Sequence, residues 1–214
     1  MNRKIASLVV GAAVAGGAMT ALAQQATAPA DVKIETTNLA PGIYMLTGRG
    51  GNIGLTVGAD GAAIIDDQFA DMVPKIRAAV ALLSEKPVKF VINTHLHGDH
   101  TGGNDAFGAA GAVIIAQENV RKRLGSPQVN PSNNQELPAR AREALPVFTF
   151  ADSATLHFND DDLEFTHLPN AHTETDIVVR FRKANVVHMG DLLVAGFPFI
   201  DGNNGGTLDG YIAA

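Results

Sequence analysis

Three histidines and one aspartate occupy four of six consecutive positions, in the order His-Leu-His-Gly-Asp-His. Residues i and i+2 of an extended loop point the same way, so His95 and His97 are placed to hold one ion. Gly98 lets the chain turn sharply, which aims Asp99 and His100 at a second position nearby. Imidazole nitrogens with a carboxylate suit Zn²⁺, with Fe or Mn as alternatives. The pattern predicts a metal site rather than a chance cluster of loop histidines.

The composition excludes several other kinds of site. The chain contains no cysteine, so a disulfide scaffold, a thiolate zinc site, an iron–sulfur cluster and a cysteine nucleophile are all ruled out. The net charge is −6, and the longest basic run is residues 121–123, so we expect no nucleic-acid partner. With 214 residues, 46% of them hydrophobic, the chain is long enough for one domain with a sizeable core.

The elements that must position the histidine-rich loop are mostly strands. A strand predicted at 89–93 leads directly into the loop, so the loop lies at a strand's carboxyl end, where α/β proteins place their sites. The glycines at 48–51 lack both phosphate-binding patterns and predict a hairpin turn. Residues 126–145 predict a long surface excursion that borders the site. Apolar patterning predicts further strands at 32–36, 43–46, 52–57, 62–66, 111–116, 154–158, 163–168, 176–181 and 186–189, and helices at 71–85 and 118–124.

These strand clusters, interrupted by one or two helices in each half, predict an α/β (α+β) fold with two sheets packed face to face and helices outside. The N-terminus predicts export. A short basic start, an apolar stretch at 5–20 and the small-x-small pattern at 21–23 are typical of a signal peptide, although an uncleaved anchor is the alternative. We expect a periplasmic protein with no stable membrane anchor after cleavage. The expected division is a signal peptide at 1–23, a flexible tether at 24–31 and a single domain at 32–214.

The His-x-His-x-Asp-His motif after a strand, in an exported chain of this pattern, resembles the metallo-β-lactamase-fold hydrolase superfamily. The resemblance runs from about Val32 to the C-terminus. It implies an αββα sandwich of two mixed sheets flanked by helices, with one or two zinc ions at the sheet edges. It also implies a third histidine on the first metal, a carboxylate that bridges the two metals, and a last histidine near the C-terminus.

Two of these further ligands can be placed by the resemblance. His172, in a loop between two predicted strands, matches the third histidine; a loop histidine in solvent is the alternative. Asp191, which follows a strand and a glycine, resembles the bridging carboxylate; a helix N-cap or turn aspartate is the alternative. The first metal would then be held by His95, His97 and His172, leaving a position for solvent. The second would be held by Asp99, His100 and Asp191.

The other candidate residues have weaker claims. His188 lies in an apolar strand and is expected to support a ligand or to be a satisfied core histidine, not a ligand itself. His157 and His167 alternate with apolar neighbours and are expected to face the surface. Asp66, at the end of a buried strand, is placed either to hydrogen-bond a ligating histidine and fix its tautomer or simply to make a turn. Asp67 is a weaker candidate for the same role.

The C-terminus departs from the family pattern. No histidine follows His188, and residues 208–214 are typical of the opening of a helix. We therefore expect a truncated chain whose last strand and helices are missing, with a second metal position that lacks its closing ligand. The number of zinc ions per chain, one or two, stays open.

The resemblance implies a zinc-dependent hydrolase of small molecules. A metal-bound hydroxide would attack the carbonyl of an ester, thioester, lactone or lactam, and Asp99 would be the catalytic residue that orients the water or moves its proton. The lack of cysteine excludes lactamase subclasses with a zinc thiolate, and Asp191 favours the thioesterase- and lactonase-like branches over the remaining dizinc lactamases. The alternatives are a β-lactamase, a periplasmic metal-binding accessory protein of an oxidative pathway, and an inactive truncated fragment.

Overall fold

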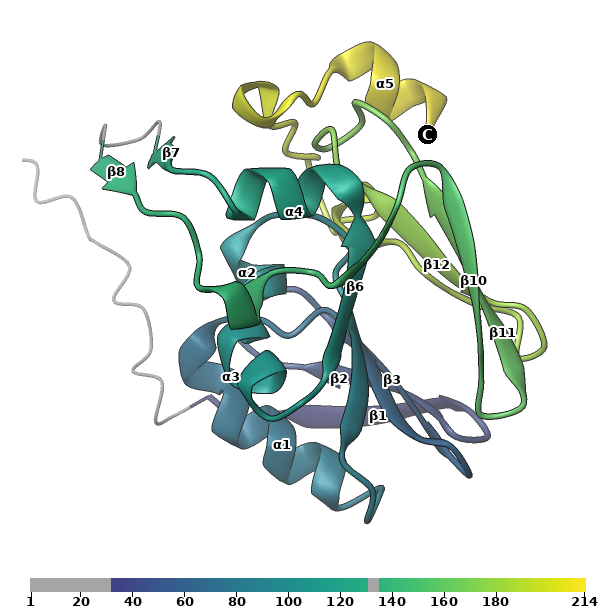
Figure 1. Cartoon of the computed structure of the whole chain (residues 1–214). Helices are drawn as coiled ribbons and strands as arrows, with labels where there is room; N and C mark the ends of the chain where they lie inside the picture. The colour runs from purple at the N-terminus through teal and green to yellow at the C-terminus, as the bar shows by residue number, and fades with distance from the viewer. Residues whose placement is uncertain (1–31, 131–134) are drawn as a thin grey trace, which may run out of the picture.

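Two β-sheets pack face to face in the part of the chain that the computed structural model describes, residues 32–130 and 135–214. Helices α1, α3 and α4 lie on the outer side of the larger sheet, and the smaller sheet lies on its other side (Figure 1). The predicted signal peptide (1–23) and tether (24–31) fall outside the described residues. None of the helices in the described ranges has the length and apolar character needed to cross a bilayer.

The larger sheet is mixed and has seven strands in the order β1-β2-β3-β4-β5-β6-β9. Its first four strands are antiparallel, and β4, β5, β6 and β9 run parallel to one another. Its strands are β1 (Glu35–Ala40), β2 (Ile43–Thr47), β3 (Ile53–Gly58), β4 (Gly61–Ile65), β5 (Val88–Ile92), β6 (Val113–Gln117) and β9 (Phe148–Phe150).

The smaller sheet has the order β10-β11-β12-β13, and its three described pairings are antiparallel. The sandwich is confirmed, but this second sheet is antiparallel, not mixed. Asn159 and Asp160, both with positive φ, make the tight turn that joins its first two strands as a hairpin. Its strands are β10 (Ser153–Phe158), β11 (Asp161–His167), β12 (Ile177–Phe181) and β13 (Val186–His188); a separate hairpin pairs β7 (Gln128–Asn130) with β8 (Gln135–Leu137).

The helices are short. They are α1 (Val73–Ala81), α2 (Gly98–Thr101), α3 (Asn104–Ala109), α4 (Glu118–Leu124) and α5 (Leu208–Ala213), with 3-10 turns at Ala70–Met72, Arg142–Ala144, Gly190–Leu192 and Gly202–Asn204. The helix predicted at 71–85 is therefore shorter than expected. Pro74 fixes its first turn, and the helix ends at Ala81, although Leu83 still packs on the core from the turn that follows.

The first strand is displaced from its predicted position. It was expected at 32–36 but begins at Glu35, which pairs with Thr47 of β2. Val32 and Ile34 are apolar because they pack on the core beneath the helices, not because they alternate within the sheet. The predicted excursion at 126–145 contains the β7–β8 hairpin, of which residues 131–134 lie outside the described part.

Strand β4 shows how the core positions the site. Ala62 and Ile64 pack toward the helices, whereas Ala63 and Ile65 pack toward the second sheet, so the strand is buried on both faces. Ile65 is in register with Ile92 of the parallel strand β5. The residues that follow these two strands therefore emerge at the same edge of the sheet, beside each other.

Candidate metal centre

All six side chains predicted as metal ligands gather at this edge of the sandwich. Four of them come from the segment after β5, and two come from connections of the smaller sheet. In chain order they are His95 and His97 in the loop after β5, Asp99 and His100 in α2, His172 between β11 and β12, and Asp191 in the 3-10 turn after β13.

Three imidazole nitrogens form a close group. Nδ1 of His97 lies 3.1 Å from Nε2 of His95 and 3.0 Å from Nε2 of His172. These three atoms and a carboxylate oxygen of Asp191 all lie within 4.8 Å of one another. Nitrogens bound to one tetrahedral zinc at about 2.0–2.1 Å lie about 3.3 Å apart, so the group has the size that one such ion requires.

The outer ring nitrogen of each of these histidines is hydrogen-bonded to an oxygen. His172 Nδ1 lies 2.7 Å from the Phe199 carbonyl oxygen, and His97 Nε2 lies 2.8 Å from Asp201 Oδ2. Because a carbonyl or carboxylate oxygen only accepts, each of these nitrogens must carry the proton and donate it. In the neutral form of each ring, the other nitrogen therefore presents a lone pair to the centre of the group.

Asp66 fixes two more histidines in the same way. Its Oδ2 lies 2.7 Å from His100 Nδ1, which donates to it. The same carboxylate accepts hydrogen bonds from the backbone N–H of Thr94 (2.7 Å) and from its hydroxyl (2.8 Å). The Thr94 oxygen is then free to accept from His95 Nδ1, 3.0 Å away. The predicted hydrogen bond between Asp66 and a candidate ligand is confirmed, and Asp66 reaches a second histidine through Thr94.

His100 faces a cluster of negative charge. Its Nε2 is buried and makes no hydrogen bond of normal geometry, although Asp191 Oδ1 lies 3.2 Å away and Asp99 Oδ2 lies 3.5 Å away. Burial alone would lower the pKa of His100, but the carboxylates of Asp66, Asp191 and Asp99 outweigh it and raise the pKa to about 12. These carboxylates therefore favour a positive charge at Nε2, which a proton or a metal cation can supply.

Asp191 lies between the two groups. One of its oxygens, Oδ1, faces His100, and the other, Oδ2, lies 3.6 Å from His172 Nε2. Burial raises the pKa of Asp191, but the contact with His100 outweighs it, and the net shift is downward, so the group stays ionised. For His95 the effect is opposite: burial and the neighbouring imidazoles hold its pKa well below the usual value, which leaves a neutral ring that can bind a metal.

The remaining candidate residues lie outside the group. His157 is exposed beside Asp162, as expected, but His167 is half-buried and bonds the Glu174 carbonyl, 2.9 Å away. This contact ties β11 to the loop that carries His172. Asp67 is fully buried, accepts the Gly103 N–H, and has a pKa raised by burial, so it supports the start of α3 and not a ligand.

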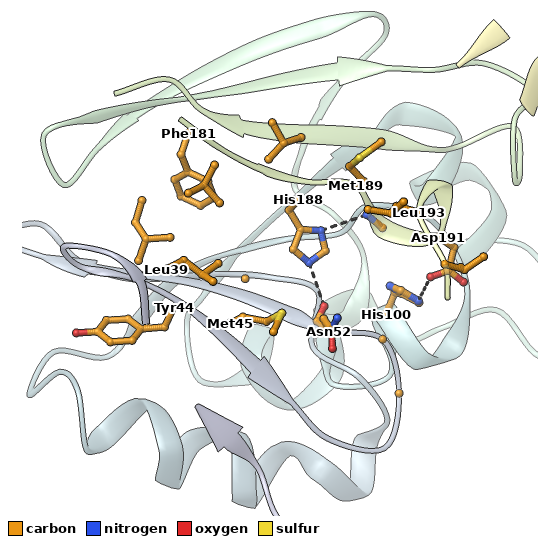
Figure 2. A pocket seen from close by; sticks show the side chains of 18 of the residues that line it. Leu39, Tyr44, Met45, Asn52, His100, Phe181, His188, Met189, Asp191 and Leu193 are labelled. Carbon is orange, nitrogen blue, oxygen red and sulfur yellow. Dashed lines mark hydrogen bonds and ion pairs between the residues drawn. The ribbon is translucent and has the colours of Figure 1, made fainter. Parts of the chain in front are cut away.

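His188 lies outside the group of candidate ligands, and both of its ring nitrogens are hydrogen-bonded. It is half-buried and lines a cavity of about 400 Å³ that opens beside His100 and Asp191 (Figure 2). Much of the cavity wall is apolar. The apolar lining includes Leu39, Ile43, Met45, Phe181, Val186, Met189 and Leu193.

Asp201 was missed by the sequence analysis. It bonds His97 from 104 residues further along the chain, and it also accepts the backbone N–H groups of Asn203 and Asn204. Its only local signal is that of an aspartate beginning a short turn, which says nothing of a distant histidine. The contact depends on the path of the loop after β13, and that path could not be read from residue spacing.

Comparison with known proteins agrees with this geometry. Residues 46–213 match the family model described as the metallo-beta-lactamase superfamily. No curated protein matches the sequence. A metallo-beta-lactamase with a HARLDQ motif from Cronobacter sakazakii (Enterobacter sakazakii) superposes with a TM-score of 0.66 and 18% identity, over 85% of this chain and 67% of that one.

Two further solved structures are similar. A metallo-beta-lactamase from Pontibacter korlensis has a TM-score of 0.68 and 18% identity, over 84% of this chain and 81% of that one. A class B3 di-zinc metallo-beta-lactamase from an Alaskan soil metagenome has a TM-score of 0.59 and 17% identity, over 70% of this chain and 57% of that one, so the chain spans less than two thirds of its length.

At these identities the structural likeness establishes the fold, while the family model covers most of the sequence. Both agree with the cluster of histidines and aspartates at the sheet edge. The chain belongs to the metallo-beta-lactamase superfamily of metal-dependent hydrolases.

Proposed function

We propose that this chain is a zinc-dependent hydrolase that cleaves a carbonyl substrate: an ester, thioester, lactone or lactam. The observation that carries the proposal is the direction of the protons on three histidines. Oxygen acceptors hold the outer N–H of His95, His97 and His172, so the inner nitrogens of the neutral rings converge without protons of their own. Lone pairs 3.0–3.1 Å apart repel each other unless a proton or a metal cation lies among them.

The donor set suits zinc in two adjacent positions. His95, His97 and His172 would hold the first ion, and Asp99, His100 and Asp191 would hold the second, with Asp191 shared between them. Imidazole with carboxylate is a usual zinc environment, and a set with no thiolate also accepts Fe or Mn. When bound, zinc supplies a Lewis acid and lowers the pKa of a water to about 7.

Asp99 is the residue we assign to proton movement. Contact with the His100 imidazole lowers the pKa of Asp99, so it is ionised at neutral pH, and it is only half-buried. An ionised carboxylate at the edge of the group can orient a water molecule and accept its proton. The cavity of about 400 Å³ beside His100 and Asp191 has room for a small molecule with an apolar part.

β-Lactam hydrolysis is the second candidate. All three solved structures compared above are named as metallo-beta-lactamases. Against it stands Asp191, because the resemblance assigns a bridging carboxylate to the thioesterase- and lactonase-like branches. A periplasmic location, reached through the signal peptide at 1–23, is part of the proposal and fits a β-lactamase better than a glutathione-thioester hydrolase.

The test combines metal content with turnover. We would purify the chain without added metal, measure zinc, iron and manganese per chain, and assay a chromogenic ester, a thioester, a lactone and a chromogenic cephalosporin. The expected result is one or two zinc ions and turnover of at least one substrate, with both zinc and turnover lost in His95→Ala. The matched control is His157→Ala, which removes an exposed imidazole 79% open to solvent.

Other outcomes discriminate between the alternatives. Stoichiometric metal with no turnover on any substrate would favour a metal-binding accessory protein or an inactive fragment. Turnover that persists in His95→Ala would overturn the assignment of the site. Circular dichroism of this variant separates loss of metal from loss of fold.

A further inference from the structure

His188 makes contacts that the proposed function does not use. It ends β13, on the opposite sheet from the histidine-rich loop. Its Nε2 lies 3.0 Å from the carbonyl oxygen of Asn52, which begins the run into β3, and its Nδ1 lies 3.3 Å from the backbone nitrogen of Gly190 (Figure 2). One imidazole thus joins the two sheets beside the candidate metal centre.

The partners determine which nitrogen of His188 carries the proton. The Asn52 carbonyl can only accept, so Nε2 donates to it. The Gly190 N–H can only donate, so Nδ1 accepts from it. A neutral ring protonated at Nε2 satisfies both contacts at once, and no other natural side chain places a donor and an acceptor at these two points with a rigid ring between them.

The first contact holds the loop between β2 and β3 against His100. At Gly51, a Cβ would lie 2.4 Å from His100 Cε1, so this backbone rests directly on the imidazole. The Gly51 carbonyl is also held, by the Gln68 amide at 2.7 Å. Side chains from two different parts of the fold therefore bind two consecutive carbonyls of one loop.

The second contact holds the turn that presents Asp191. Gly190 has φ +52°, and a Cβ there would lie 2.8 Å from Thr94 Oγ1, so the turn fits closely against the loop that leads from β5 into His95. Asp191 is the next residue. A hydrogen bond that holds the Gly190 N–H in place therefore also fixes the backbone position from which the Asp191 side chain extends.

We propose that His188 is a positioning residue with two separable contacts: the one with Gly190 sets how Asp191 faces His100, and the one with Asn52 holds the β2–β3 loop. The role of Asp191 toward a metal rests on the proposed function above. The hydrogen bonds of His188 go to the Asn52 carbonyl and the Gly190 N–H, so its effect on Asp191 passes through the backbone.

Three substitutions separate the two contacts. His188→Asn can keep an oxygen near the place of Nδ1, so it retains an acceptor for Gly190 and loses the bond to Asn52. His188→Gln can keep a donor near the place of Nε2, so it retains Asn52 and loses Gly190. His188→Phe keeps a ring and loses both. The control is His157→Phe, on the exposed side of β10.

Two readouts on the full chain are needed: amide hydrogen exchange of the metal-free protein, and zinc affinity by calorimetry. We expect His188→Phe to speed exchange at Gly190 and in residues 48–52, and to weaken zinc binding about tenfold or more, the size found for residues that orient metal ligands. Zinc affinity should depend on the Gly190 contact. His188→Asn keeps that contact, so its zinc affinity should stay within about threefold of the wild type; His188→Gln loses it, so its zinc affinity should fall as far as that of His188→Phe. Amide exchange in residues 48–52 should depend on the Asn52 contact instead, so it should be faster in His188→Asn and close to that of the wild type in His188→Gln.

The proposal is overturned if the wild type binds zinc and His188→Phe binds it within about twofold as tightly, or if exchange at Gly190 is unchanged. A wild type that binds no zinc would overturn the proposed function as well, so the two failures are distinguishable. If His188→Phe does not fold, the opposite responses of the Asn and Gln variants still decide the matter.

Discussion

Asp66 lies 2.7 Å from His100 at a place where neither side chain is open to solvent, and its carboxylate also holds Thr94. Since Thr94 accepts the outer N–H of His95, one buried carboxylate orients a histidine in each of the two proposed metal positions. Asp66 has φ +65°, a conformation that favours aspartate and asparagine among residues with a side chain.

This relationship predicts the effect of Asp66→Asn. Asparagine tolerates the same backbone conformation, so the fold should persist, but the charge that holds the His100 and Thr94 protons is lost. We expect zinc affinity to fall about 10–100-fold, measured by calorimetry on metal-free protein. Asp162→Asn, on the outer face of the smaller sheet, is the control and should bind zinc like the wild type. Equal affinities for both variants would contradict this role.

Gly51→Ala should disturb the His100 position by a steric route. The new methyl carbon would lie 2.4 Å from His100 Cε1, so the loop or the ring must move. We expect weaker binding of the zinc held by Asp99, His100 and Asp191, with the ion at the three other ligands less affected. Gly202→Ala meets nothing within 4 Å and serves as the control. A crystal structure of Gly51→Ala with an unmoved ring would refute the prediction.

Zinc binding at His100 should depend on pH in a defined direction. In the metal-free chain burial opposes the charged ring, but the carboxylates raise the pKa of His100 to about 12, so the ring is protonated at neutral pH. Zinc must displace that proton, and apparent affinity at this position should therefore rise by about tenfold per pH unit between about pH 7 and 8.5. Calorimetry in buffers of different ionisation enthalpy would count the released proton. His100→Ala should lose this component, and an unchanged slope in that variant would disprove the assignment.

Much of the candidate site could be predicted because its signal is local. His95, His97, Asp99 and His100 fall within one short loop after a buried strand, and the structure brings their side chains together. The packing of two sheets against each other could be predicted from the strand pattern, because the apolar run of β4 indicates a strand that is buried on both faces. His172 and Asp191 required the family resemblance, because nothing near them in sequence shows what they face.

Contacts made across long stretches of chain could not be predicted. Asp201 reaches His97 over 104 residues, and His188 reaches Asn52 over 136. Each is a single polar side chain whose sequence neighbours carry no motif, and its hydrogen-bond partner is determined by how the two sheets pack. The resemblance implied two mixed sheets, whereas the described pairings of the smaller sheet are antiparallel; beyond a hairpin, strand patterns show which face is buried but not the direction of the neighbouring strand.

The packing between the two sheets predicts a large stability effect at Phe165. Its side chain is 1% exposed and stacks on Phe150 with ring centroids 5.7 Å apart, so it lies in the apolar layer that joins the sheets. Phe165→Ala would remove these contacts and leave a cavity, and we expect the free energy of unfolding to fall by about 3–5 kcal/mol in urea denaturation of the metal-free protein. Phe148→Ala removes a ring of the same size that is 50% exposed, so its cost should be less than half as large. Similar losses for both would mean that the layer around Phe165 collapses to fill the space and that the two sheets are less tightly interlocked than this packing indicates.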